Sequence, residues 1–286
     1  MSAVLAPQTR AQCFRNCKIE IAPTGEVLGA TVCSLQRFRP SNIECINPVA
    51  RGQRGYSAAP DTRAARLRAR RRVNQLITCN SDLDVFFTLT LAPDWTAAGQ
   101  THSRTDYAAI NRHLQQWLSN RVRRRGLKYV AVYEYHHKLE TDGKPAIHVH
   151  GVANHGALVM QDAGRKYQDK LGHWHKIFNM PDWTCGITTA MYMYGDRKAA
   201  TEYICKYIYK SESAVGGRWY MHSHNLQDVH YHLCNVDYRA AAELGRTVCC
   251  QPGHCSYIYI SAANVDKLVL DDVSFRSPAD AGAGGD

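Results

Sequence analysis

The chain has 286 residues, 45% of them hydrophobic and 21% charged, a composition that supports a buried core and argues against disorder as the main state. Its 35 basic residues outnumber its 25 acidic ones and give a formal net charge of +10, which favours a polyanionic partner such as nucleic acid. The sequence contains no membrane-spanning apolar run, no secretory leader and no Gly-x-x-x-x-Gly-Lys-Ser/Thr phosphate loop, so we expect a cytoplasmic protein without a membrane partner or a nucleotide cofactor.

Residues 1–80 are predicted to hold a small cysteine-containing element followed by a basic helix. A hairpin is expected within 18–28, turned at a Pro-Thr-Gly sequence. The helix is expected over Thr62–Ile77 and is rich in arginine without any acidic residue. We expect this helix to follow a nucleic-acid backbone, and the alternative is a solvated basic surface. Its arginines include Arg70, Arg71 and Arg72.

Residues 81–226 carry the clearest alternating and helical patterns. Val85–Leu91 alternates apolar and polar residues with the period of a strand. A helix is expected over Ser103–Arg125, ended by Gly126. Its last turn offers a second basic surface for DNA, formed by Arg123, Arg124 and Arg125. The remaining predictions are strands at 128–135, 146–152 and 186–194, a helix at 196–211 and a polar insertion at about 154–184.

Residues 227–286 are expected to form a C-terminal extension that is partly strand-like at 248–260 and ends in a disordered tail. The odd number of cysteines, eleven, and the missing export signal predict reduced thiols. Structural Zn²⁺ is a weaker alternative, because the cysteines lack the paired Cys-x-x-Cys spacing of compact zinc sites. Its candidate ligands are Cys13, Cys17, Cys33 and Cys45, or Cys249, Cys250, His254 and Cys255.

Paired histidines mark a candidate metal site. His148 and His150 lie in an alternating strand, whose period puts both imidazoles on one face about 7 Å apart. Four His-x-His sequences occur in the chain, so the tripeptide alone is weak evidence. A three-residue hairpin loop at 141–143 would pair Glu134 with His150 on that face, whereas a two-residue turn would move the carboxylate to the other face. Such ligands suit Mg²⁺ or Mn²⁺ acting on a phosphate oxygen, and the alternative is a pair of solvent-facing histidines.

The helix predicted over 196–211 carries a second candidate site. Tyr203 and Tyr207 are four residues apart and share a face, and Lys206 and Lys210 each follow a tyrosine by three residues. A tyrosine that attacks a phosphodiester forms a phosphotyrosine that can be rejoined, and nearby cations stabilise the charge that develops. We therefore predict catalytic roles for both tyrosines and Lys206, and a nucleic-acid contact for Lys210. The alternative is that the tyrosines are packing aromatics of an amphipathic helix.

The order of these motifs carries a family resemblance. Phe87-Thr-Leu-Thr-Leu91 comes first, then Glu134, then His148-Val-His150, and then Tyr203-Ile-Cys-Lys-Tyr207-Ile-Tyr-Lys210. This arrangement resembles the His-hydrophobic-His (HUH) endonucleases that initiate rolling-circle replication. It is most similar to the initiators of small single-stranded DNA phages of the filamentous and microvirus type. The resemblance covers about residues 83–226, and the tyrosine-lysine motif is its most specific part.

The resemblance implies an α+β domain over 81–226 whose central, mainly antiparallel sheet is of the ferredoxin or RNA-recognition type. Its helices would lie on one face, and Glu134, His148 and His150 would lie on the open one. The implied activity is a metal-dependent nick in single-stranded DNA at a replication origin, with a 5′-phosphotyrosine intermediate and a 3′-hydroxyl primer. Implied partners are a host helicase and DNA polymerase in a bacterial cell, and Arg218 is a further expected DNA contact. A non-catalytic single-strand binder and a transposase-like strand transferase remain alternatives.

Overall fold

The computed structural model describes residues 14–35, 38, 62–168, 172–193, 197–210, 214–250 and 256–268. These residues form two compact units, a larger one within 58–227 and a smaller one from the described parts of 1–57 and 228–286. Both units combine helices with antiparallel sheets, so the chain has the α+β fold that the sequence predicts. Among the described residues, none of the helices combines the length and apolar character that crossing a membrane would require.

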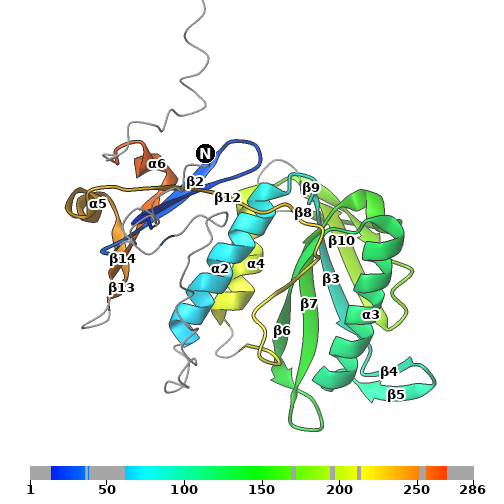
Figure 1. The fold of residues 1–286 in the computed structure, drawn as a ribbon. Helices are drawn as coiled ribbons and strands as arrows, with labels where there is room; N and C mark the ends of the chain where they lie inside the picture. The colour runs from blue at the N-terminus through cyan, green and yellow to red at the C-terminus, as the bar shows by residue number, and fades with distance from the viewer. Residues whose placement is uncertain are drawn as a thin grey trace, which may run out of the picture. The chain divides into compact units, whose positions relative to one another are not determined.

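The larger unit is built on a seven-stranded antiparallel sheet with the order β11-β6-β7-β3-β10-β9-β8 (Figure 1). Its strands are β3 (Val85–Leu91), β6 (Tyr129–Leu139), β7 (Pro145–Ala153), β8 (Gln161–Gln168), β9 (Trp174–Asn179), β10 (Gly186–Tyr192) and β11 (Met221–His222). Its helices are α2 (Thr62–Cys79), α3 (Tyr107–Arg125) and α4 (Arg197–Lys210). A short 3-10 helix, His155–Ala157, follows β7.

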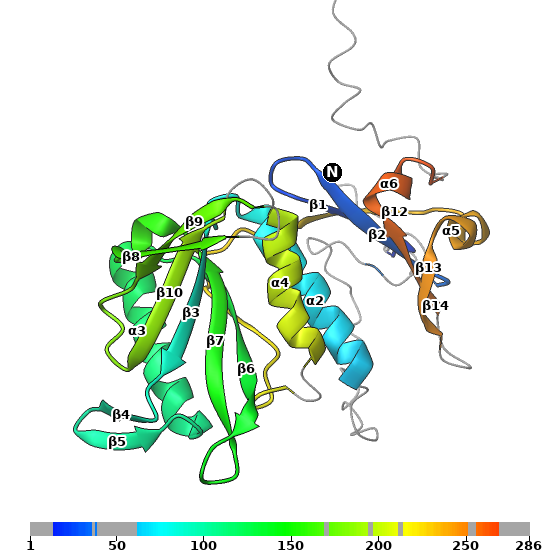
Figure 2. The same cartoon turned by 180° about the vertical axis from the view of Figure 1, so that it is seen from behind.

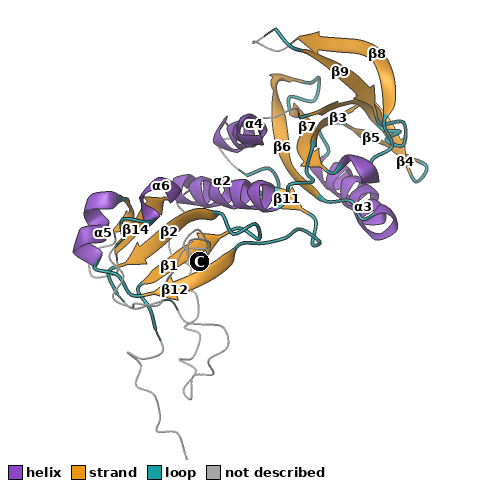
Figure 3. Ribbon diagram, turned by 90° about the horizontal axis from the view of Figure 1, so that it is seen from above, coloured by secondary structure: helices purple, strands orange, loops and turns teal. Residues whose placement is uncertain are grey.

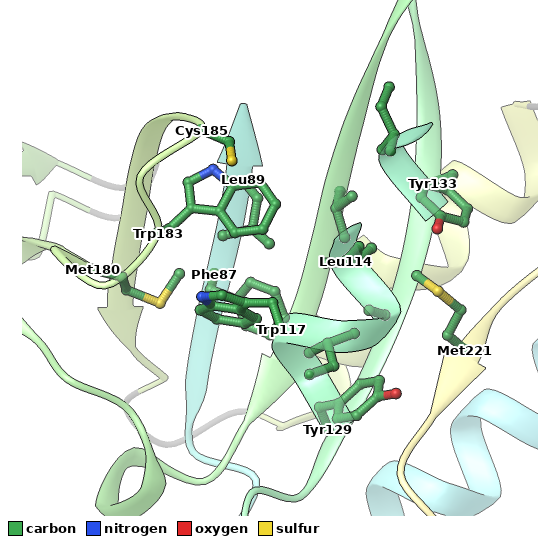
Figure 4. Packing of buried hydrophobic residues seen from close by; sticks show 14 of the residues in the cluster. Phe87, Leu89, Leu114, Trp117, Tyr129, Tyr133, Met180, Trp183, Cys185 and Met221 are labelled. Atoms are coloured by element: carbon green, nitrogen blue, oxygen red, sulfur yellow. The ribbon is translucent and has the colours of Figure 1, made fainter. Parts of the chain in front are cut away.

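Helices cover both faces of this sheet, which corrects the prediction of one open face (Figure 3). On one face, α3 packs Leu114 and Trp117 against Phe87 and Leu89 of β3 (Figure 4). On the other, α2 and α4 lie side by side over the apolar side chains of β6 and β7 (Figure 2). The reason is that β6 is buried at five consecutive positions, Tyr129–Tyr133, so both of its faces need a partner.

Two local predictions also differ from the structure. The helix expected from Ser103 begins at Tyr107, where Asp106 caps it by accepting a hydrogen bond from the backbone N–H of Ala109 at 3.1 Å. The residues before it form the hairpin of β4 (Asp94–Ala97) and β5 (Gln100–Ser103). The polar insertion at about 154–184 contains two strands that the sequence did not predict, because β8 and β9 pair with each other and extend the sheet from β10.

The smaller unit is a five-stranded antiparallel sheet with the order β12-β1-β2-β14-β13. Its elements are β1 (Cys17–Ile21), β2 (Val27–Cys33), β12 (His230–Cys234), α5 (Tyr238–Leu244), β13 (Arg246–Cys250), β14 (Ser256–Ser261) and α6 (Ala262–Val265). The predicted hairpin at 18–28 is therefore present as β1 and β2. A two-stranded hairpin is rarely stable alone, and here the C-terminal strands β12 and β14 pair with its two edges.

The larger unit ends at Gln227, next to the predicted boundary at 226/227, but its other boundary does not follow the predicted division at 80/81. The basic helix α2 belongs to the larger unit, because its residues Val73, Leu76 and Ile77 are buried against α4 and the sheet. The expected N-terminal element and C-terminal extension are one unit, because they share a single sheet. The expected tail beyond 268 lies outside the described residues.

Candidate active site

The β6–β7 hairpin brings the predicted metal ligands onto one face, but in a different register from the expected one. Glu134 lies opposite His148 rather than His150. The pairing shifts between Tyr135 and Leu139, where β6 contains two residues more than β7. An offset of two residues preserves the side on which each side chain points, because the strand period is two. Glu134, His148 and His150 therefore share the face that α2 and α4 cover.

His150 is the best-anchored residue of the site. Its side chain is 6% exposed, and both ring nitrogens have partners. Nε2 lies 2.8 Å from Oε2 of Glu134, and Nδ1 lies 3.0 Å from Oγ1 of Thr88, which is its cross-strand neighbour on β3. These contacts fix the plane of the imidazole ring.

His148 lies beside His136, a histidine that the sequence offers as an alternative to Glu134 as the third ligand. The rings of His148 and His136 stack with their centroids 5.3 Å apart, and the centroids of His148 and His150 are 6.4 Å apart. Burial lowers the pKa of His148, and the neighbouring His150 and His136 lower it further. The imidazole therefore favours its neutral form, which is the form that binds metal ions. The even spacing of His136 from Glu134 is consistent with this shared face.

The two tyrosines of α4 lie over the histidines, but in different environments. The ring of Tyr207 stacks on His150 with centroids 4.1 Å apart and an interplanar angle of 3°. Tyr203 meets Tyr207 edge-on at 5.2 Å and meets Phe86 of β3 edge-on at 5.0 Å. Tyr203 is 43% exposed, whereas Tyr207 is 6% exposed. Tyr207 is thus both a core aromatic and a neighbour of the histidine pair.

Burial raises the pKa of Tyr207, and Tyr203 and Glu134 raise it further because they disfavour a second negative charge nearby. The phenol of Tyr207 therefore stays protonated at neutral pH unless a cation or a base acts on it. Lys206 is exposed, and its Nζ lies 5.8 Å from the centroid of the Tyr203 ring. The side chain of Lys210 lies outside the described residues.

The arginines selected from the sequence are spread over three elements of the larger unit. Arg70, Arg71 and Arg72 are half-buried on α2. Arg123, Arg124 and Arg125 are exposed at the end of α3, and Arg218 is exposed in the turn before β11. A DNA contact for each of them stays a prediction.

The donor set fits a divalent cation in part. Among the described residues, no group of three or more histidine, cysteine, aspartate or glutamate side chains is already arranged around a common point. The 2.8 Å between Glu134 Oε2 and His150 Nε2 nevertheless approaches the roughly 3 Å that separates adjacent ligands of an octahedral ion with bonds of about 2.1 Å. His148 shares their face and supplies a further neutral imidazole.

Most of the candidate zinc ligands lie outside the described residues, so a structural zinc site stays a prediction. Cys13, Cys45, His254 and Cys255 lie outside the described residues, as do the side chains of Cys249 and Cys250. Cys17 and Cys33 are buried. Cys17 lies opposite Cys234 in the β1–β12 pair, and the contact with this second thiol, together with burial, raises the pKa of Cys17.

Comparison with known proteins adds one finding. Residues 84–212 match the model of a family described as replication-associated proteins of the ORF2 type. The match supports a role in replication initiation. It spans β3, the β6–β7 hairpin and α4, which are the elements that carry Thr88, Glu134, both histidines and both tyrosines. No significant match was found among curated proteins or among solved structures.

Proposed function

We propose that the chain is a metal-dependent endonuclease that nicks and rejoins single-stranded DNA at a replication origin and so initiates rolling-circle replication. The observation that carries this proposal is the stacking of Tyr207 of α4 on His150 of β7. A candidate nucleophile and a candidate metal ligand, 57 positions apart in the sequence, are thereby in direct contact. The family match to a replication-associated protein supports the same function.

In this proposal Glu134, His148 and His150 hold Mg²⁺ or Mn²⁺, which would supply positive charge at the scissile phosphodiester. Thr88 acts as a positioning residue. For Nε2 of His150 to coordinate a cation, Nδ1 must carry the proton, and Oγ1 of Thr88 lies at 3.0 Å to accept it. The hydroxyl can accept that proton, so the contact supports the tautomer that binds metal.

The nick itself is a transfer between oxygen atoms. The phenolic oxygen of Tyr203, the more exposed tyrosine, forms a bond to phosphorus, and the bond from phosphorus to the 3′ oxygen breaks. The phenolic proton is accounted for by the new 3′-hydroxyl, so no further reactant is needed. Lys206, close to Tyr203, would neutralise charge on the phosphate. The reverse reaction, at either tyrosine, joins the released strand.

The remaining assignments complete this proposal. Lys210, Arg218 and the arginine groups at 70–72 and 123–125 would contact the DNA backbone. A host DNA polymerase in a bacterial cell would extend the 3′-hydroxyl, and a host helicase would unwind the duplex. The initiators of filamentous-phage and microvirus type are the nearest model for the reaction, since they combine two tyrosines with paired histidines.

The test is incubation of the chain with a library of single-stranded oligonucleotides and Mn²⁺, followed by mapping of peptide-linked 5′ phosphates. We expect an adduct on Tyr203 or Tyr207 and a free 3′-hydroxyl on the other product. His148→Ala and His150→Ala should abolish the adduct while DNA binding persists.

Two other outcomes would replace the proposal. Tight binding without any adduct would indicate a non-catalytic single-strand binder. Adducts confined to paired DNA ends, with strand exchange between them, would indicate a strand transferase of transposase type. Undiminished nicking by either histidine variant would contradict the metal site while leaving the nuclease in place.

A further inference from the structure

A pocket of about 390 Å³ opens at the β11 edge of the large sheet. It is lined by Gln115, Tyr129, Arg218, Tyr220, Met221 and His222. Its volume is within the range of about 300–1,000 Å³ found for small-ligand sites. Met221 lies opposite Ala131 and faces the core under α3, whereas His222 lies opposite Val130 and faces the side of the sheet that carries the candidate active site. The pocket therefore spans the β11 edge, and none of its lining residues belongs to the candidate active site.

The turn that carries Arg218 is tightly built. Backbone hydrogen bonds join Gly217 to Ala214 and Arg218 to Val215, and Val215 is buried in the core. Gly216, with φ of 56°, lies so close to Tyr107 that a Cβ atom there would overlap the tyrosine ring. Only glycine fits this close approach and this φ. The structure therefore fixes the position from which Arg218 extends.

Arg218 lines the pocket together with Tyr129 and Tyr220. In the described part of the chain, it forms no ion pair with a carboxylate. Burial raises the pKa of Tyr129 and Tyr133, and the positive charge of Arg218 lowers each in part, so the cation lies near both phenols. These tyrosines lie on either side of Met221 in Figure 4. A cation above neutral hydroxyl groups, without a carboxylate partner among the described residues, is suited to an anion.

Aromatic rings complete the pocket wall. Tyr220 and His222 stack with centroids 5.8 Å apart and an interplanar angle of 22°. A third ring cannot enter between them, because that would need about 7 Å, twice the optimal carbon–carbon contact. A base could stack only on an outer face of the pair, and His222 is exposed. Nδ1 of His222 contacts the carbonyl oxygen of Ser223 at 3.0 Å, which leaves Nε2 for a ligand.

We propose that this pocket is a second nucleic-acid site, which binds one nucleotide of the single-stranded substrate with its phosphate on Arg218 and its base against His222. The inference rests on the proposed function, because it takes the ligand to be part of the DNA that the enzyme cuts. A strand bound in the pocket passes along the β11 edge, because the lining residues come from both faces of that strand. None of them belongs to the candidate active site, so the bound nucleotide is not the one that is cut, and it contributes to origin binding rather than to chemistry.

The test is a neutral-phosphate scan of a bound oligonucleotide, measured with the full chain in EDTA so that no cleavage competes. Each phosphate in turn is replaced by an uncharged methylphosphonate, and affinity is measured for the unchanged protein, Arg218→Gln and Arg165→Gln. Arg165 is an exposed arginine on β8, at the other edge of the sheet, and its substitution removes the same charge. In a second scan, each base in turn is removed from the oligonucleotide, and affinity is measured for the unchanged protein and for His222→Ala. This scan locates the base that stacks on His222.

We expect one phosphate position where the methylphosphonate weakens binding about tenfold in the unchanged protein and in Arg165→Gln, but not in Arg218→Gln. Arg218→Gln should also reduce the salt dependence of log K by about 0.7, the value for one single-strand phosphate. If each methylphosphonate weakened binding equally in all three proteins, the pocket assignment would be wrong. Binding of free thymidine monophosphate as tight as that of the oligonucleotide would also overturn it, because the site would then serve a free nucleotide. An Arg218-dependent phosphate position without any tyrosine adduct would support the pocket proposal and contradict the proposed nuclease function.

Discussion

The hydroxyl of Thr88 is predicted to control how tightly the site binds a cation. Oγ1 of Thr88 lies 3.0 Å from Nδ1 of His150, and Nε2 of the same ring faces Glu134. When Nε2 coordinates a cation, Nδ1 carries a proton that only Thr88 is placed to accept among these contacts. Thr88→Val keeps the shape of the side chain and removes the acceptor. The proton on Nδ1 is then left without a partner on a residue that is 6% exposed.

The expected loss follows from that buried donor. Leaving a buried polar group unpaired costs about 1–3 kcal/mol, and second-shell hydrogen bonds to metal-bound histidines contribute about 10- to 100-fold in affinity. The smaller end of both ranges applies, because Thr88 is itself only half-buried and water can replace part of the contact. We expect Thr88→Val to weaken Mn²⁺ binding about tenfold, which corresponds to about 1.4 kcal/mol.

Mn²⁺ titration followed by electron paramagnetic resonance measures this affinity directly, without DNA. Thr90→Val is the matched control, because Thr90 lies opposite His148 on the same face of β3 and, between these two described residues, no hydrogen bond is formed. Thr88→Ser, which restores the hydroxyl, should bind Mn²⁺ like the unchanged protein. Unchanged affinity in Thr88→Val, or an equal loss in Thr90→Val, would refute the tautomer argument.

Three further predictions follow from named contacts. Tyr203→Phe should reduce oligonucleotide nicking more than Tyr207→Phe, because Tyr203 is far more exposed, and the double variant should form no adduct; equal loss in both would contradict this order. Gly151→Ala should lower the free energy of unfolding in urea by about 1–3 kcal/mol, because the new Cβ would overlap the ring of Phe87, whereas Gly156→Ala, with nothing within 4 Å, should not. His113→Gln should flatten the acid side of the stability profile, read by tryptophan fluorescence. Burial lowers the pKa of His113, and Arg121 and His102 lower it further. The contribution of the neutral imidazole to the free energy of unfolding is therefore present above about pH 6.5 and is lost as the pH falls below that value. An unchanged profile in His113→Gln would contradict this.

The sequence predicted the local parts of the site well, because strand and helix periods decide which side chains share a face. The alternation of Val85–Leu91 appears as alternating burial along β3. The spacing of Tyr203 and Tyr207 places both rings within contact of one another. Glu134 lies on the predicted face although its cross-strand partner is His148 rather than the predicted His150. The irregularity in β6 adds two residues, and an even number leaves the side of the strand unchanged.

What the sequence could not predict depends on contacts between distant segments. The helices α2 and α4 pack over the histidines because their apolar residues form one cluster with those of β6 and β7. No local sequence pattern specifies which strands these helices pack against. The pairing of β1 with β12 joins segments more than 200 residues apart. The strand β8 carries mainly exposed polar residues, and the apolar residues of β9, Trp174, Ile177 and Phe178, do not alternate with polar ones. Both strands therefore lack the apolar alternation by which strands are recognised.

The two interpretations of Tyr207, catalytic residue and packing aromatic, do not exclude one another. Its neighbours Ile204 and Ile208 are buried in the cluster with Val73 and Ile77 of α2, so the packing of α4 sets the position of the phenol. The same packing holds the ring parallel to His150, at 4.1 Å. A core position keeps a side chain in one rotamer, which is the order that a reacting group needs. Tyr203, one turn away and largely outside the core, has the freedom to meet an incoming strand. The helix thus combines one fixed and one accessible phenol, and this difference provides a physical basis for unequal roles in cutting and rejoining.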